Sequence, residues 1–160
     1  MKNKKLKSRE TIKKIAGDLR KKNKKIVAAS GCFDILHAGH IDFLGKAKSA
    51  GDFLVVLLNS DSSVKSYKGE SRPLNSLHLR AQALSGLEAV DFIAPFDEPT
   101  PLNILEVIKP HVFAQGSDWG KNCIERETVE RNGGEIKVIK KIKDLSTTDL
   151  LEKIRALPHL

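Results

Sequence analysis

Two histidines, three residues apart, lie in a short segment that also contains glycines. The segment reads Gly31-Cys32-Phe33-Asp34-Ile35-Leu36-His37-Ala38-Gly39-His40. If a helix begins between His37 and His40, the two imidazoles can point to the same side. Two nitrogen donors at the start of a helix suit the negative charge that grows on a phosphoryl group in a transition state. The spacing therefore favours a site for a phosphorylated ligand.

The same histidine pair allows two other interpretations. It could bind a metal ion, although no third ligand is evident in the sequence around it. It could also be a structural pair whose ring nitrogens are satisfied by backbone contacts. The spacing alone leaves all three interpretations open.

Gly31 indicates that the backbone, as well as the two imidazole rings, contributes to this site. A glycine at this position lets the backbone come close to a phosphate. A helix that begins after the loop turns its N-terminal N–H groups and the positive end of its dipole toward the same space. We therefore expect the loop to bind an anion.

Alternating strands and helices must position this loop. Residues 53–58 are a near-continuous apolar run, as a strand covered on both faces requires. We expect strands at 25–30, 53–58, 91–94, 112–114 and 135–139, and helices at 38–49, 62–67, 77–87, 101–109, 124–131 and from 145–147 to 155. This alternation predicts an α/β fold, a Rossmann-like doubly wound parallel five-stranded sheet with helices on both faces in a single domain. In such a sheet, the carboxyl end of the first strand opens on the crevice where ligands bind.

Positive charge is concentrated at the N-terminus. The formal net charge is +8, yet residues 1–25 hold 12 lysines and arginines against Glu10 and Asp18, so the remainder is slightly acidic. Within residues 1–24, the apolar side chains fall on one face of a predicted amphipathic helix, namely Ile12, Ile15, Ala16 and Leu19. We separate this basic helix, 1–24, from a domain over 25–160. The helix either docks on the domain with its lysines in solvent or forms a polyanion-binding arm, but few aromatic residues accompany the lysines as a single-strand binder would need.

The number of cysteines and the length of the apolar runs indicate the cellular compartment of the protein. Cys32 and Cys123 cannot form a disulfide framework, and they lack the partners of a structural zinc site. The longest apolar runs are far shorter than the ~20 residues of a membrane span. No apolar stretch follows the N-terminal lysines as it would in a signal peptide. We expect a cytoplasmic protein that does not enter a membrane.

Two motifs carry a resemblance to a known superfamily. The first, Gly-x-Phe-Asp-x-x-His-x-Gly-His, spans residues 31–40, and the second is Leu145-Ser146-Thr147-Thr148-Asp149. Together they resemble the small nucleotidyltransferases related to class I aminoacyl-tRNA synthetases, which include glycerol-3-phosphate cytidylyltransferase. Segments 59–61, 68–73, 86–91 and 132–135 narrow the resemblance to the adenylyltransferases of heptose biosynthesis. It covers residues 8–156, and many members are fused to a sugar kinase.

The resemblance implies a role for each matching residue. His37, His40 and Lys46 would be catalytic, the histidines holding the nucleotide phosphates and stabilising the transition state. The nucleotide would be bound by Gly31, Cys32, Phe33, Gly39, Arg80, Gly116, Asp118, Ser146, Thr147 and Thr148. The second substrate would be bound by Asp34, Arg72, Gln115 and Trp119. Lys46, Arg72 and Arg80 are the candidate cations for phosphate charge, and Lys46 ranks first among them, although lysines and arginines on helices and loops are more often merely solvated.

Gln115 marks a departure from the family pattern. Members carry a Lys-Gly-Gly-Asp-Tyr-like segment where this chain has Gln115-Gly116-Ser117-Asp118-Trp119. A glutamine can hydrogen-bond a sugar but cannot neutralise a phosphate. This difference bears on the identity of the acceptor substrate more than on the transfer reaction itself. Trp119 could lie over a sugar or base, or it could have a half-buried packing role.

The implied reaction transfers AMP from ATP to a sugar 1-phosphate, giving an ADP-sugar and pyrophosphate. The acceptor would be D-glycero-D-manno-heptose 1-phosphate, and Mg²⁺ would be bound through the nucleotide phosphates. A separate sugar kinase would be a functional partner, and a homodimer is expected from the frequency of such assemblies. The alternatives are a CTP-dependent cytidylyltransferase acting on glycerol 3-phosphate or a related polyol phosphate, and a non-catalytic nucleotide- or RNA-binding module. Nucleic acid is not expected as a partner.

Overall fold

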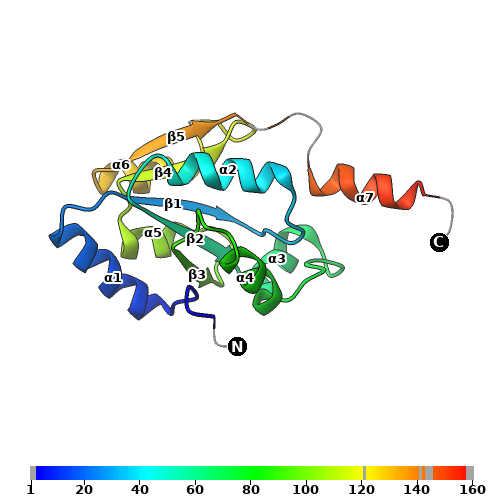
Figure 1. The fold of residues 1–160 in the computed structure, drawn as a ribbon, viewed down its shortest axis with the longest axis horizontal. Coiled ribbons are helices and arrows are strands. Elements are labelled where there is room, and N and C mark those ends of the chain that lie inside the picture. The colour runs from blue at the N-terminus through cyan, green and yellow to red at the C-terminus, as the bar shows by residue number, and fades with distance from the viewer. Residues whose placement is uncertain (1–2, 121, 141, 143–145, 158–160) are drawn as a thin grey trace.

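A parallel sheet forms the centre of the molecule. The computed structural model describes residues 3–120, 122–140, 142 and 146–157. Its strands are β1 (Ile26–Gly31), β2 (Phe53–Asn59), β3 (Phe92–Phe96), β4 (Val112–Gly116) and β5 (Glu135–Ile139). They lie in the order β3-β2-β1-β4-β5, and every pairing is parallel. The predicted α/β fold is confirmed, with β1 in the middle (Figure 1).

Helices lie between these strands and at both ends of the chain. They are α1 (Arg9–Lys21), α2 (Ala38–Lys48), α3 (Asp61–Lys68), α4 (Leu77–Ser85), α5 (Leu102–Ile108), α6 (Arg126–Arg131) and α7 (Thr147–Arg155). The expected helix over 101–109 begins one residue later, because Pro101 takes the N-cap position. The predicted Leu145 at the entry to α7 lies outside the described residues. Across the described ranges, every helix is too short or too polar to span a bilayer.

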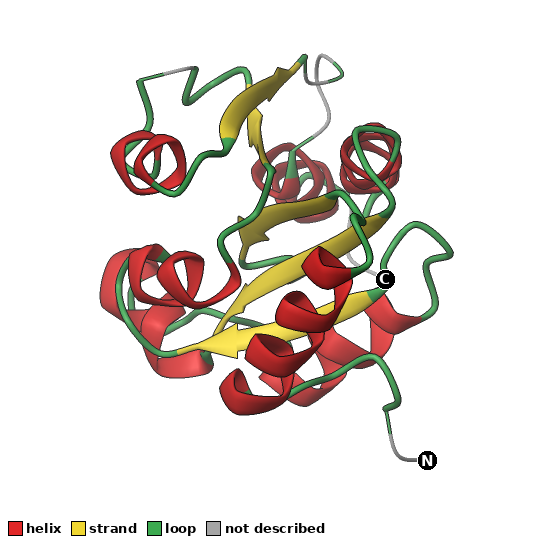
Figure 2. Ribbon diagram, turned by 90° about the vertical axis from the view of Figure 1, so that its left-hand side faces the viewer, coloured by secondary structure: helices red, strands yellow, loops and turns green. Residues whose placement is uncertain are grey.

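Helices cover both faces of the sheet (Figure 2). On one face, α2 and α4 pack Leu44 and Leu84 against strand side chains such as Val56. On the other, α1, α5 and α6 pack against side chains such as Val55. Adjacent residues of one strand thus enter different cores, because strand side chains alternate between the two faces. Burial on both faces explains why β2 reads as an unbroken apolar run.

The basic N-terminal helix is part of this layered structure. Ile12 and Ala16 of α1 are fully or almost fully buried in the core that α1 shares with α5. Lys13 and Lys14, on the other side of α1, are exposed. Before the helix, Lys7 donates its backbone N–H to the carbonyl of Ile93 at 2.9 Å, next to an isolated parallel bridge from Leu6. The lysines of α1 therefore face solvent while its apolar side is docked.

Candidate active site

A cavity of about 310 Å³ lies at the carboxyl ends of β1 and β4. These strands are neighbours, and the chain leaves them toward opposite edges of the sheet, since β2 and β3 follow on one side and β5 on the other. Such a reversal of strand order opens a crevice at the carboxyl ends of the strands. All the residues that the sequence singled out line the cavity except Lys46 and Arg80.

The two histidines converge as their spacing predicted. His37 is the N-cap residue of α2 and His40 lies in its first turn. Their rings stack with centroids 3.9 Å apart, and the Phe33 ring meets His40 edge-on at 5.2 Å. The predicted helix start between the two histidines is therefore confirmed. Within the described ranges, no three His, Cys, Asp or Glu side chains are grouped so that they could hold a metal ion.

Gly31 at the end of β1 is required by close packing. A Cβ atom at this position would lie 2.9 Å from a ring carbon of Phe33. Phe33 itself has a backbone φ of 47°, the left-handed region that a bulky residue rarely adopts. The turn after β1 is thus a tight, specifically shaped part of the cavity wall.

A second helix begins at the cavity. Ser146, Thr147 and Thr148 line it, and Ser146 is the N-cap of α7. The Ser146 hydroxyl accepts a hydrogen bond from the backbone N–H of Asp149, whose carboxylate in turn accepts from the Ser146 backbone N–H. This capping box holds the first turn of the helix. The N-termini of α2 and α7 therefore reach one space, where the helix dipoles and the amide groups of both favour an anion.

Among the residues that the structure describes, two cations line the cavity, Lys68 at the end of α3 and Arg72 in the following loop. The Arg72 guanidinium donates to the buried Asp34 carboxylate at 2.9 Å. Lys68 is a residue that sequence reasoning missed. Residues 68–73 contribute to the family resemblance, but the sequence pattern predicts no role for the lysine.

Lys46 and Arg80 lie elsewhere. Lys46 is in the last turn of α2, about 12 Å along the helix axis from its cavity end at a rise of 1.5 Å per residue. Its ammonium pairs instead with Asp42 at 2.7 Å. The Arg80 side chain is fully buried beneath the cavity wall and bonds to backbone carbonyls and Asp61. Neither side chain is placed to meet a ligand in this cavity.

Asp34 lines the cavity, but its carboxylate is used by the protein. Besides Arg72, it accepts the backbone N–H of Leu74 at 2.9 Å and that of Asn75 at 2.8 Å. A buried carboxylate with these partners holds the loop rather than presenting open acceptor sites. Its contribution to a substrate site is thus to fix Arg72 at the cavity.

The far wall of the cavity comes from β4 and the residues after it. Gln115 is buried, and its amide nitrogen donates to the buried Glu125 carboxylate at 3.5 Å. Gly116, Asp118 and Trp119 continue this wall. The Trp119 side chain is 70% exposed, so it is not the half-buried packing residue that was one expectation. Ser30, Phe43 and Ile142 complete the lining and had not been singled out.

Comparison with known proteins identifies the family of this chain. A family model described as cytidylyltransferase-like matches residues 28–154. The bifunctional protein HldE of Wolinella succinogenes is 48% identical over 149 residues, which are 92% of this chain and 31% of that protein. The bifunctional protein HldE of Aliarcobacter butzleri is 44% identical over 151 residues, again 31% of its length. The chain therefore spans about a third of these relatives.

Solved structures give the same fold. A lipopolysaccharide core biosynthesis protein from Thermoplasma volcanium is 28% identical with a TM-score of 0.59, and the match covers 75% of this chain and 98% of that one. A pantoate-beta-alanine ligase from Francisella tularensis has a TM-score of 0.65 over 94% of this chain and 76% of its own. Its 19% identity supports the fold alone.

Proposed function

The chain belongs to the cytidylyltransferase-like family of nucleotidyltransferases, and from this premise we propose that it transfers AMP from ATP to a sugar 1-phosphate. The acceptor we propose is D-glycero-D-manno-heptose 1-phosphate, on the resemblance to the adenylyltransferases of heptose biosynthesis. The observation that carries the proposal is the meeting of two helix N-termini, a stacked histidine pair and two cations at one cavity.

The reaction is an in-line displacement. An oxygen of the sugar 1-phosphate attacks the α-phosphorus of ATP, the bond from that phosphorus to the bridging oxygen breaks, and pyrophosphate leaves with the bridging oxygen. The attacking phosphate is already ionised at neutral pH, so no general base is needed. Positioning and stabilisation of charge then supply most of the rate.

The cavity residues divide this work. His37 and His40 face the phosphate charge that grows in the transition state, while Ser146, Thr147 and Thr148 hold the outer phosphates at the N-terminus of α7. Lys68 and Arg72 supply positive charge at the same cavity. Mg²⁺ would enter on the triphosphate, whose oxygens it prefers, and it would neutralise phosphate charge there.

Two further proposals concern partners. A kinase is one class of enzyme that makes sugar 1-phosphates, and we propose a sugar kinase as the supplier. The HldE relatives are named bifunctional, and this chain matches only 31% of their length. A homodimer remains a prediction from the frequency of such assemblies.

The decisive experiment crosses the four nucleoside triphosphates with several sugar and polyol phosphates and measures pyrophosphate release. We expect ATP with heptose 1-phosphate to give the highest kcat/KM. Highest activity with CTP and glycerol 3-phosphate would instead support the cytidylyltransferase alternative. Nucleotide binding without pyrophosphate release from any pair would contradict the proposed transfer reaction.

A further inference from the structure

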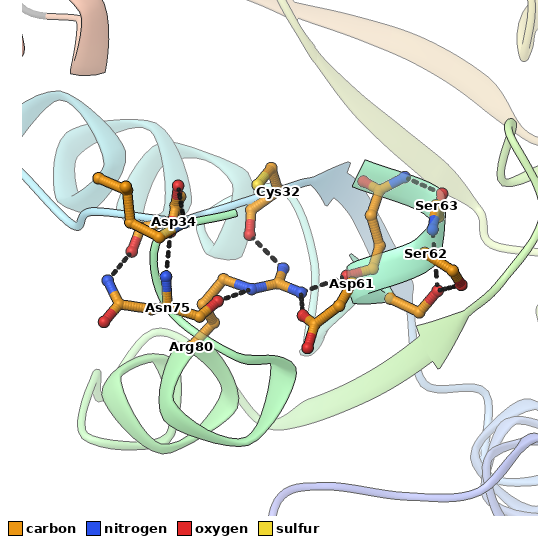
Figure 3. A network of polar contacts seen from close by, with 10 residues as sticks. Cys32, Asp34, Asp61, Ser62, Ser63, Asn75 and Arg80 are labelled. Carbon is orange, nitrogen blue, oxygen red and sulfur yellow. Dashed lines mark hydrogen bonds and ion pairs between the residues drawn. The ribbon is translucent and has the colours of Figure 1, made fainter. Parts of the chain in front are cut away.

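Arg80 is a fully buried charged side chain that no step of the proposed reaction uses. Its guanidinium donates hydrogen bonds to the carbonyls of Asn75 at 3.0 Å, Cys32 at 2.6 Å and Asn59 at 2.8 Å. It also pairs with the Asp61 carboxylate at 2.8 Å. Figure 3 shows this guanidinium between the turn after β1 and the start of α3. One side chain thus ties together segments that follow β1, end β2 and precede α4.

The contact with Cys32 bears directly on the cavity. Cys32, Phe33 and Asp34 line the cavity, whereas Arg80 and Asn75 do not. Phe33, in the middle of this turn, has the left-handed φ of 47°. A bulky residue in this conformation persists only where its surroundings hold it.

Both sides of Phe33 are held from behind the cavity. On one side, the Cys32 carbonyl accepts from Arg80. On the other, the Asp34 carbonyl accepts from the Asn75 side-chain amide at 2.8 Å, and the Asp34 carboxylate accepts from the Asn75 backbone N–H at the same distance. Arg80 in turn holds the Asn75 carbonyl. Arg80 and Asn75 therefore form one support for the turn of residues 32–34.

We propose that Arg80 and Asn75 are positioning residues for nucleotide binding, which hold the 32–34 turn in its cavity-lining conformation without touching the nucleotide. The inference rests on the proposed function, since it takes the cavity to bind a nucleoside triphosphate. A planar guanidinium reaches three carbonyls at fixed angles, and a lysine ammonium cannot reproduce this fork. Small displacements of groups that orient a ligand are costly, on the order of a hundredfold per ångström in rate.

The test compares Arg80→Lys, Asn75→Ala and Asp61→Asn with the wild type. Asp61→Asn is the matched control, because it removes the ion pair of Arg80 but no contact to the turn, and Asp61 does not line the cavity. The dissociation constant of a non-hydrolysable ATP analogue is measured by calorimetry at a temperature where each variant is folded, and thermal unfolding is recorded in parallel.

We expect Arg80→Lys to raise that dissociation constant by about tenfold or more, and Asn75→Ala by about threefold or more. Asp61→Asn should change it by less than about twofold, even where it lowers the unfolding temperature, because Asp61 bonds to the Arg80 guanidinium and makes no contact with the turn of residues 32–34. In the variant that combines Arg80→Lys with Asn75→Ala, the two losses of binding free energy should not be additive, because both substitutions act through the same turn.

Wild-type affinity in both Arg80→Lys and Asn75→Ala would overturn the positioning role. It would also be overturned if Asp61→Asn lost as much affinity as Arg80→Lys, since the effect would then follow stability. If Arg80→Lys does not fold, Asn75→Ala decides alone, because it removes only a side-chain amide. Absence of nucleotide binding by the wild type would instead refute the proposed function.

Discussion

His40 lies between two other rings, with His37 stacked on its face and Phe33 against its edge. This packing fixes the imidazole at the N-terminus of α2, where a donor to a developing negative charge is most effective. We expect His40→Ala to lower turnover by about a hundredfold or more, ~3 kcal/mol, as loss of an oxyanion-type donor does. Pyrophosphate release measures the change. The control is His78→Ala, on an exposed position of α4, and near-normal turnover in His40→Ala would remove His40 from the mechanism.

Cys32 also lines the cavity, but we expect its thiol to take no part. Burial raises the pKa of this thiol, and the opposing effect of nearby Lys68 and Arg80 does not cancel the increase. The thiol is therefore protonated at neutral pH and a poor nucleophile. Cys32→Ala should keep kcat within about threefold of the wild type, with the same pH profile between pH 6 and 8. Loss of activity with the fold intact would contradict this expectation.

Two lysines offer a comparison within one chain. Lys68 lines the cavity, whereas Lys46 pairs with Asp42 on an exposed surface of α2. We expect Lys68→Ala to raise KM for ATP at least about tenfold, as loss of a charged phosphate contact does. Lys46→Ala should change KM by less than about twofold, because an exposed i,i+4 pair contributes little. Steady-state kinetics on both variants decides, and the reverse ranking would restore Lys46 as the active cation.

The residues of the site differ in how well the sequence alone predicts their positions in the fold. His37, His40 and Gly31 are close together in the sequence, so their local spacing was enough to predict a shared cavity wall. The position of Arg80 could not be predicted in this way, because its partner Cys32 is 48 residues distant. Lys68 was missed for a similar reason, since only the folded structure shows that the end of α3 lies at the cavity.

At the scale of elements, the periodicity of apolar residues predicted the strands and the helices after the first to within two residues at each end. The N-terminal helix was expected over 1–24, but α1 spans only Arg9–Lys21, because the Ser8 side chain caps its first turn. β5 was predicted at its exact bounds, because the glycines before it end the preceding helix and its apolar residues alternate. Among the strands, the largest difference is at β3 and β4, which extend two residues beyond the expected ends, to Phe96 and Gly116. Polar or turn-forming residues such as Pro95 and Gln115 mask the ends of these strands in a sequence pattern.

The junction between α1 and the loop after β3 provides a test by pH. Arg9 pairs with Glu98 at 2.7 Å. Burial by itself raises the pKa of Glu98, but hydrogen bonds from Arg9, from its own backbone and from Asn103 outweigh burial and lower the pKa from 4.5 to about 2. The carboxylate therefore stabilises the folded state above the unfolded pKa, and this contribution is lost as the pH falls from 4.5 to about 2.

We expect Glu98→Gln to lower the free energy of unfolding at pH 7 by no more than about 1 kcal/mol, because solvent screens this partly exposed pair. The difference in the free energy of unfolding between Glu98→Gln and the wild type should decrease as the pH falls below 4.5. Urea unfolding at pH 7, 4 and 3 measures it. A difference that stays constant over this range would contradict the assignment of charge to Glu98.

At the scale of the whole molecule, the basic N-terminus is part of the structure rather than a detached arm. Residues 5–7 bond to Ile93, on the side of the sheet distant from the cavity beside β4. Deleting residues 1–7 should therefore lower the unfolding temperature, by about 2–4 °C for each kcal/mol lost, and leave kcat within about twofold. Calorimetry and pyrophosphate release measure the two effects. Loss of turnover without loss of stability would contradict this separation.

The pairing of residues 5–7 with β3 also limits how copies of the molecule can associate. A sheet edge with open backbone groups is a template on which a foreign strand can add. Here the N-terminal segment occupies the β3 edge, and at the opposite edge β5 is short and carries exposed Glu135 and Lys137. Charged side chains on a short edge strand oppose edge-to-edge growth. We therefore expect self-association of this fold to use helix surfaces, which would leave the sheet five strands wide.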